Sequence, residues 1–105
     1  MLQGSTISYT HVLPWLRVCE ITLVLPNLSE IFSGYRLLQL SDIHINDGHM
    51  TKKRLEQVVA VSNRYKADAA VITGDFVTKW NASSKEGLSP LRLLQSKDPV
   101  YRISE

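Results

Sequence analysis

The chain has 105 residues, of which 44% are hydrophobic and 21% charged, with 12 Lys and Arg against 10 Asp and Glu. These fractions are typical of a folded globular protein and exclude a chain that is disordered as a whole. The net charge of +2 indicates no nucleic-acid partner, and the single cysteine excludes an internal disulfide.

The first 15 residues are expected to form a loose leader, because residues 1–11 are polar and mixed. Residues 16–25 then alternate apolar with polar side chains, which predicts an antiparallel or edge strand. Prolines and charged residues interrupt the apolar stretch 12–28, which falls short of the roughly 18 uncharged residues of a spanning helix. No transmembrane segment is therefore expected in this chain.

Two short apolar runs with a helix between them come next. Residues 35–40 predict a buried strand that stops at Ser41-Asp42, and residues 69–73 predict a second buried strand that stops at Gly74-Asp75. The intervening segment, about 51–66, has the periodicity of an amphipathic helix, with Thr51 as its N-cap. Its predicted core-facing residues are Leu55, Val58, Val59, Ser62 and Tyr65.

Strand, helix and strand in this order predict a βαβ unit with parallel strands, and hence an α/β fold. Residues 79–89 are expected to be a loop, followed by a short helix that begins near Pro90. Residues 100–103 then predict a third strand.

Acidic and imidazole side chains follow directly after the two central strands. In extended backbone Asp42 and His44 would point to the same side, with their backbones about 6.5 to 7 Å apart. Asp75 ends the neighbouring strand on the same edge, and Gly74 permits a sharp turn or close backbone approach beside it. This oxygen and nitrogen set suits Mn, Fe or Zn better than Ca or Mg. Solvent-exposed acids at strand ends are the alternative interpretation.

Two segments carry a family resemblance. Leu-Leu-Gln-Leu-Ser-Asp-Ile-His at 37–44 and Ala-Asp-Ala-Ala-Val-Ile-Thr-Gly-Asp-Phe-Val at 67–77 resemble the opening half of the calcineurin-like metallophosphoesterases. The resemblance implies a four-layered α/β/β/α sandwich with two divalent metal ions, Mn, Fe or Zn. It implies that Asp42 and His44 bind the first ion and that Asp75 bridges both.

The same resemblance implies a hydrolase. The reaction would be hydrolysis of a phosphomonoester, phosphodiester or pyrophosphate by a metal-bridging hydroxide, on a phosphorylated small-molecule or lipid substrate. A cytoplasmic location, in keeping with the single cysteine, or a membrane-associated one, in keeping with the resemblance, is expected.

The later motifs of that family, G-N-H-D/E and G-H-x-H, do not occur in the sequence. Residues 16–105 are therefore expected to be a partial, truncated domain whose catalytic set is incomplete, with little or no phosphatase activity alone. The alternative is a non-catalytic α/β module that acts by interaction or weak metal binding. A receiver-like domain fits less well, since it needs adjacent acids at one strand end and a later lysine.

Overall fold

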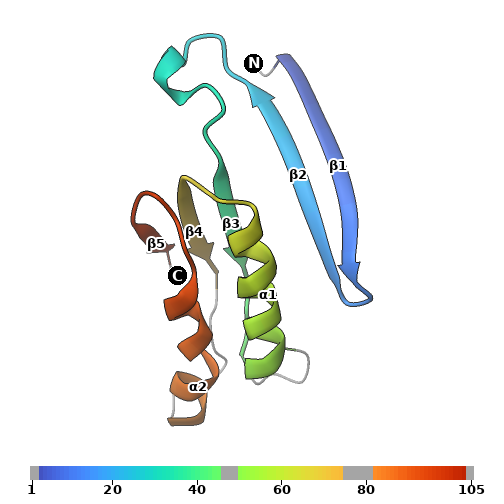
Figure 1. Ribbon diagram of the computed structural model, residues 1–105, viewed down its shortest axis with the longest axis vertical. Coiled ribbons are helices and arrows are strands. Elements are labelled where there is room, and N and C mark those ends of the chain that lie inside the picture. The colour runs from blue at the N-terminus through green and yellow to red at the C-terminus, as the bar shows by residue number, and fades with distance from the viewer. Residues whose placement is uncertain (1–2, 46–49, 75–81, 104–105) are drawn as a thin grey trace. The chain divides into compact units, whose positions relative to one another are not determined.

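The computed structural model describes residues 3–45, 50–74 and 82–103. The chain divides into two compact units, Met1–Gly34 and Tyr35–Glu105, and each is described by itself. The first unit is an antiparallel hairpin, and the second is a parallel sheet with helices (Figure 1).

The hairpin unit consists of strand β1 (Gln3–Leu13), strand β2 (Leu16–Val24) and a 3-10 turn (Glu30–Phe32). The antiparallel strand predicted from residue 16 onward is confirmed as β2. The expectation of a loose leader before it is wrong, because residues 3–13 form a strand paired with β2. Threonine, isoleucine and tyrosine in this segment favour extended backbone, and Ile7 and Tyr9 pair with apolar or small residues across the ladder.

The second unit contains the parallel sheet that the sequence predicts. Strands β3 (Leu37–Ser41), β4 (Ala69–Thr73) and β5 (Val100–Ile103) lie in the order β3-β4-β5, and both pairs are parallel. The βαβ unit and the third strand are thereby confirmed. The protein has a mixed α/β fold, consistent with part of an α/β sandwich.

Helix α1 (Lys52–Arg64) connects β3 to β4. It begins where predicted, because the Thr51 hydroxyl oxygen accepts a hydrogen bond from the Arg54 N–H at 3.2 Å. Four of the five predicted core-facing residues are buried, and Val61 joins them; Tyr65 is half-buried just after the helix ends. The apolar stripe of α1 therefore supplies much of the core.

The connection from β4 to β5 differs from the prediction. Helix α2 (Ala82–Gly87) lies within the segment 79–89 that was expected to be a loop. Alanine, lysine and glutamate favour helix, and an ion pair between Lys52 and Glu86 links α2 to the first turn of α1. The short helix predicted at Pro90 is a 3-10 helix, η2 (Ser89–Leu93).

The sheet has one covered face and one exposed face. On the covered face Ala70 and Ile72 are each only 1% exposed. On the other, which we call the open face, Leu37, Tyr101 and Ile103 are 64%, 54% and 58% exposed. The predicted strand at residues 35–40 is present as β3, but the prediction that it is buried is wrong. Strand β3 comes first in the order β3-β4-β5, at one side of the sheet, and exposes alternate side chains.

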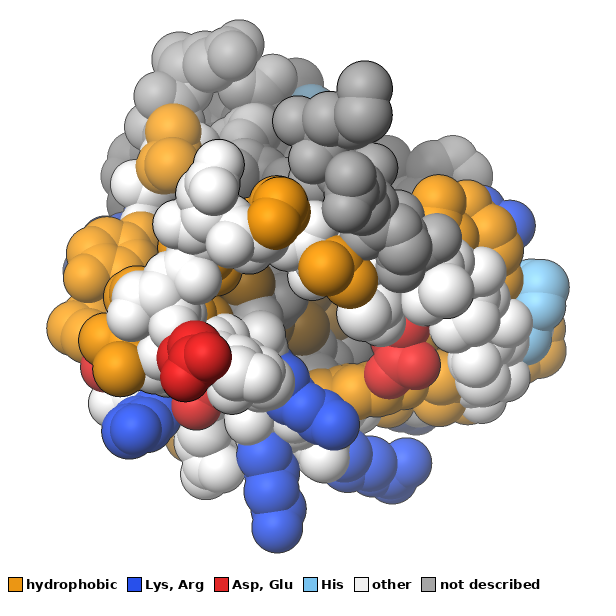
Figure 2. Space-filling model, turned by 90° about the horizontal axis from the view of Figure 1, so that it is seen from above, with side chains coloured by type: hydrophobic (Ala, Val, Ile, Leu, Met, Phe, Trp, Pro, Cys, Tyr) orange, Lys and Arg blue, Asp and Glu red, His pale blue; other side chains and the backbone are white. Residues whose placement is uncertain are grey.

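Exposed hydrophobic side chains are also visible in the space-filling view, where Lys and Arg side chains gather along one margin (Figure 2). Among the residues that the structure describes, no helix is long and apolar enough to cross a membrane.

Candidate metal site at the strand ends

Asp42 is the first residue after β3, and its backbone is fixed to the neighbouring strand. Its N–H donates a hydrogen bond to the Thr73 carbonyl oxygen at 3.0 Å, which extends the β3–β4 pairing by one step. The carboxylate thereby emerges at the edge of the sheet where parallel strands end and where open α/β sheets bind ligands.

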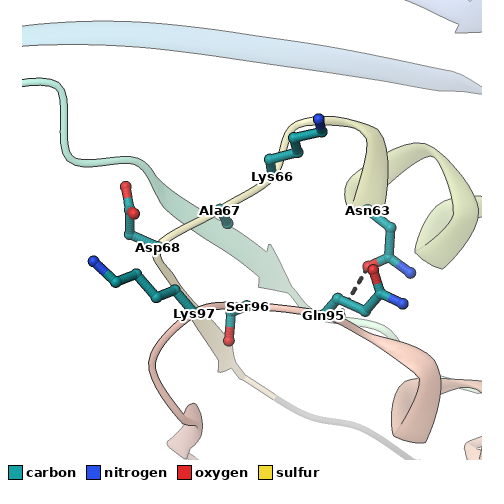
Figure 3. Close-up of a pocket in the computed structure, with 7 residues that line it drawn as sticks. All are labelled: Asn63, Lys66, Ala67, Asp68, Gln95, Ser96 and Lys97. Atoms are coloured by element: carbon teal, nitrogen blue, oxygen red, sulfur yellow. Dashed lines mark hydrogen bonds between the residues drawn. The ribbon is translucent and has the colours of Figure 1, made fainter.

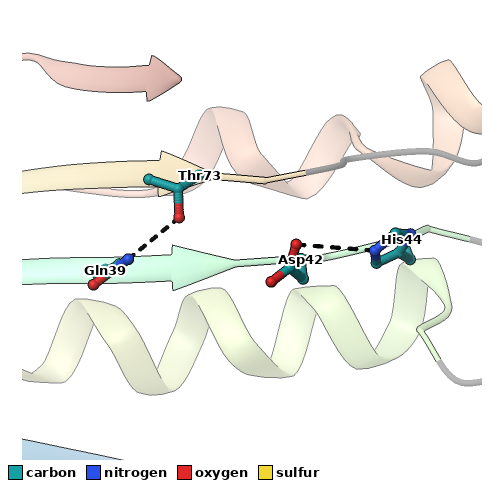
Figure 4. A network of polar contacts seen from close by, with 4 residues as sticks. All are labelled: Gln39, Asp42, His44 and Thr73. Carbon is teal, nitrogen blue, oxygen red and sulfur yellow. Dashed lines mark hydrogen bonds and ion pairs between the residues drawn. The ribbon is translucent and has the colours of Figure 1, made fainter. Parts of the chain in front are cut away.

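His44 lies close to the Asp42 carboxylate. Its Nε2 atom is 4.0 Å from Oδ1 of Asp42, and the two side chains face each other at the end of β3 (Figure 4). The flanking Ile43 and Ile45 are 6% and 2% exposed, so they anchor this segment in the core while the His44 side chain stays 38% exposed. The pair thus lies beside buried residues and is itself open to solvent.

The backbone that brings these two groups together is not the extended one expected. Asp42 has φ of 54° and His44 has φ of 46°, both in the left-handed region. Of the described non-glycine residues, one other, Lys66, has a positive φ. Such conformations cost about 1 to 3 kcal/mol each and cluster at functional sites, so their coincidence with the two predicted ligands supports a functional role.

Gly74 meets the Asp42 side chain where β4 ends. Its φ is +80°, and a Cβ added here would overlap Oδ1 of Asp42 and lie 3.0 Å from Cγ. The close approach expected from the sequence at Gly74 is confirmed.

The donor pair fits a divalent transition metal ion. Bonds of about 2.1 Å to a tetrahedral ion would place two donor atoms about 3.4 Å apart. The observed 4.0 Å between Nε2 and Oδ1 therefore needs only a small side-chain adjustment. A carboxylate oxygen with an imidazole nitrogen is a donor set suited to Mn, Fe or Zn.

Asp75, the third predicted ligand, lies outside the described residues. Within residues 3–45, 50–74 and 82–103, no three His, Cys, Asp or Glu side chains come together as a metal-binding group. The structure therefore brings together Asp42 and His44, and the three-ligand set with Asp75 stays a prediction.

A polar pair on the open face was not predicted. Gln39 donates from Nε2 to the Thr73 hydroxyl oxygen at 3.2 Å, across the β3–β4 boundary and next to Asp42 (Figure 4). The sequence offered one sign of this pair, a glutamine within the leucine-rich segment 37–40, at a position whose side chain alternates onto the exposed face of β3. This bond joins the two strands just before the site.

The opposite edge of the sheet, where the strands begin, has a shallow hollow of about 290 Å³ (Figure 3). It is lined by Asn63 of α1, by residues 66–68 that lead into β4, and by residues 95–97 that follow η2. Two of its polar side chains, those of Asn63 and Asp68, make hydrogen bonds to the backbone of neighbouring segments. The Asn63 side chain accepts from the Gln95 N–H at 2.8 Å and donates to the Leu93 carbonyl at 2.9 Å. The Asp68 carboxylate accepts from the Arg36 N–H at 2.7 Å. These hydrogen bonds join neighbouring segments of the chain, so they are explained by the fold and need no catalytic role.

Tyr35 and Asp98 join β3 to β5 at this same opposite edge. The Tyr35 hydroxyl donates to Oδ2 of Asp98 at 2.7 Å. That hydrogen bond is the main reason why the pKa of Tyr35 is raised to about 12.

The chain is similar to a curated Danio rerio protein described as "Transmembrane protein with metallophosphoesterase domain", with 28% identity over 85 residues. The match covers 81% of this chain and 19% of the relative, so the chain spans about a fifth of that protein's length. No family model matches the chain, and no solved structure matches it significantly. This distant similarity weakly supports a relationship between the chain and phosphoesterase-like proteins.

Proposed function

We propose that the strand-end site is one part of a divalent metal centre of a phosphoesterase, a hydrolase of phosphoric esters. The observation that carries this proposal is the pairing of Asp42 with His44, 4.0 Å apart, at the carboxyl ends of parallel strands. The relative with a metallophosphoesterase domain supports the same reaction class.

Each residue has a definite part in this proposal. The Asp42 carboxylate supplies negative charge and two donor oxygens, and His44 supplies a neutral nitrogen donor that faces it. Asp75, which follows Gly74, would be the carboxylate shared by two ions. Bound divalent ions would supply Lewis-acid stabilisation for a phosphoryl group of a small-molecule or lipid ester.

The test is calorimetric titration of the purified chain with Mn²⁺. We expect saturable binding that is weakened at least about tenfold by Asp42→Asn or His44→Gln, since each variant removes a donor. Asp98→Asn, at the opposite edge, should leave the affinity unchanged. Heat no greater than that of Mn²⁺ injected into buffer, or equal affinity in Asp42→Asn, would contradict the proposal.

Activity gives a second measurement on the same samples. We expect little or no turnover of para-nitrophenyl phosphate with Mn²⁺, because the sequence lacks the later motifs G-N-H-D/E and G-H-x-H that would complete the catalytic set. Multiple turnovers that disappear in Asp75→Asn would show that the chain alone is active and overturn this expectation.

A non-catalytic interaction module is the second candidate, and the exposed Leu37, Tyr101 and Ile103 on the open face favour it. Parallel sheets in folded proteins are usually covered on both faces, so this surface is suited to contact with another polypeptide. Absence of Mn²⁺ binding in the titration would favour this candidate over the metal site.

A further inference from the structure

Gly74 occupies a position where a side chain would collide with the candidate ligand. We propose that Gly74 is a positioning residue: its lack of a Cβ leaves free the space that the Asp42 carboxylate occupies, which we call the seat of this carboxylate. The inference rests on the proposed metal site for its functional consequence. Its geometric part concerns residues 42 and 74 themselves.

Three observations define the seat. The Asp42 backbone is tied to β4 next to Gly74, because its N–H donates a hydrogen bond to the carbonyl oxygen of Thr73, the residue before Gly74, at 3.0 Å. The Asp42 carboxylate lies over Gly74, so that a Cβ there would overlap Oδ1 and approach Cγ to 3.0 Å. A Cβ would also lie 3.1 Å from the Asp42 backbone nitrogen, so the contact involves main chain and side chain alike.

A side chain at position 74 therefore has two separate effects. It strains the backbone, because φ is +80°. It also moves the carboxylate away from the place where it faces His44, because the main chain of Asp42 is held to β4 and the carboxylate is the part free to turn. The second effect is the one that would change metal binding.

Gly34 provides a matched control for the first effect. Its φ is +75°, close to that of Gly74, and an added Cβ would meet nothing within 4 Å. Gly34→Ala therefore introduces the same kind of backbone strain without touching a side chain. Any loss found in Gly74→Ala but not in Gly34→Ala reports on the contact with Asp42.

The first arm of the experiment measures Mn²⁺ affinity by calorimetry. Gly74→Ala should bind Mn²⁺ roughly 10- to 100-fold more weakly than the parent chain, the range found when residues that orient metal ligands are removed. Gly34→Ala should keep the parent affinity. Equal affinity in all three chains would overturn the inference.

The second arm measures the urea midpoint of unfolding and needs no metal. Gly74→Ala should lower the midpoint more than Gly34→Ala does, and adding Asp42→Ala should cancel most of that excess. A Gly74→Ala chain that fails to fold should recover folding in the double variant. If the excess loss persists without the Asp42 carboxylate, the inference is wrong.

The two arms separate this inference from the proposed function. A parent chain that binds no Mn²⁺ contradicts the proposed function, whereas the unfolding comparison still decides whether Gly74 seats the Asp42 carboxylate.

Discussion

Asp42 and His44 approach each other because both leave β3 in left-handed conformations, with buried isoleucines on either side of His44. The sequence predicted that these two residues meet, since residues two apart in extended backbone point to the same side. It did not predict how they meet. The extended spacing assumed for residues 42–44 follows only if the strand continues, and β3 ends at Ser41.

Gly74 could be predicted as a special position, because glycine before a strand-end acid often permits unusual backbone. Its contact with the Asp42 carboxylate could not, because that contact depends on the β3–β4 register and on the Asp42 backbone angle. Asp75 is the residue for which the sequence remains the only guide, as it lies outside the described part of the chain.

Tyr35 offers a test of the structure at the opposite edge of the sheet. Its hydrogen bond to Asp98 raises the pKa of the phenol from 10.0 to about 12. The difference in phenolate absorbance between the parent chain and Tyr35→Phe should therefore titrate at about pH 12. Asp98→Asn should bring that titration down toward pH 10, because it removes the hydrogen bond to a carboxylate and also the negative charge.

The sign of the stability effect follows from the same shift. Folded Tyr35 keeps its proton to a higher pH than unfolded Tyr35, so its contribution is complete below pH 10 and is lost as the pH rises toward 12. The free energy of unfolding of the parent should fall over this interval more steeply than that of Tyr35→Phe. Titration of Tyr35 near pH 10 in the parent would show that the bond to Asp98 does not form.

At the scale of elements, α1 and β4 were the most predictable parts of the fold. Helix α1 has both a clear apolar stripe and a cap, and β4 is a short apolar run whose predicted and observed bounds agree. Local signals and tertiary packing point the same way in both. Such agreement is the condition under which sequence patterns are reliable.

The elements missed by the sequence interpretation lacked that agreement. Strand β1 (Gln3–Leu13) has polar alternate residues and is defined by its pairing with β2, which a local pattern does not reveal. Helix α2 (Ala82–Gly87) is a single short helix in a polar segment, and its link to α1 is an ion pair between residues 34 positions apart. Both depend on partners distant in sequence.

The N-cap of α1 can be tested directly. Thr51→Ala removes the acceptor for the Arg54 N–H and should lower the free energy of unfolding by about 1 kcal/mol. Thr51→Ser keeps a hydroxyl and should change it by only a few tenths. Urea unfolding followed by circular dichroism measures both. Equal losses in the two variants would show that the hydroxyl does not cap the helix.

For the whole molecule, the main features are a sheet with one open face and a site at one edge. The resemblance predicted a sandwich of two sheets, and the structure has one parallel sheet whose outer side chains, such as Leu37 and Tyr101, are exposed. The curated relative is about five times as long as the matched segment, because the match covers 19% of it. Most of the relative's length, about four fifths, therefore has no counterpart in the matched segment.

The central claim is that Asp42 and His44 hold a divalent ion at the carboxyl edge of the sheet. Its most direct test is to add substoichiometric Mn²⁺, a paramagnetic ion, and record the backbone amide signals of the chain by NMR. Strands β3 and β4 each have five residues, so their carboxyl ends lie about 17 Å from their amino ends. This distance allows an ion bound at one end to be distinguished from an ion bound at the other. Signals of residues 42–44 and of Gly74 should disappear first, while those of Arg36, Asp68 and Asp98 persist. Broadening centred on the opposite edge, or no selective broadening at all, would contradict the account.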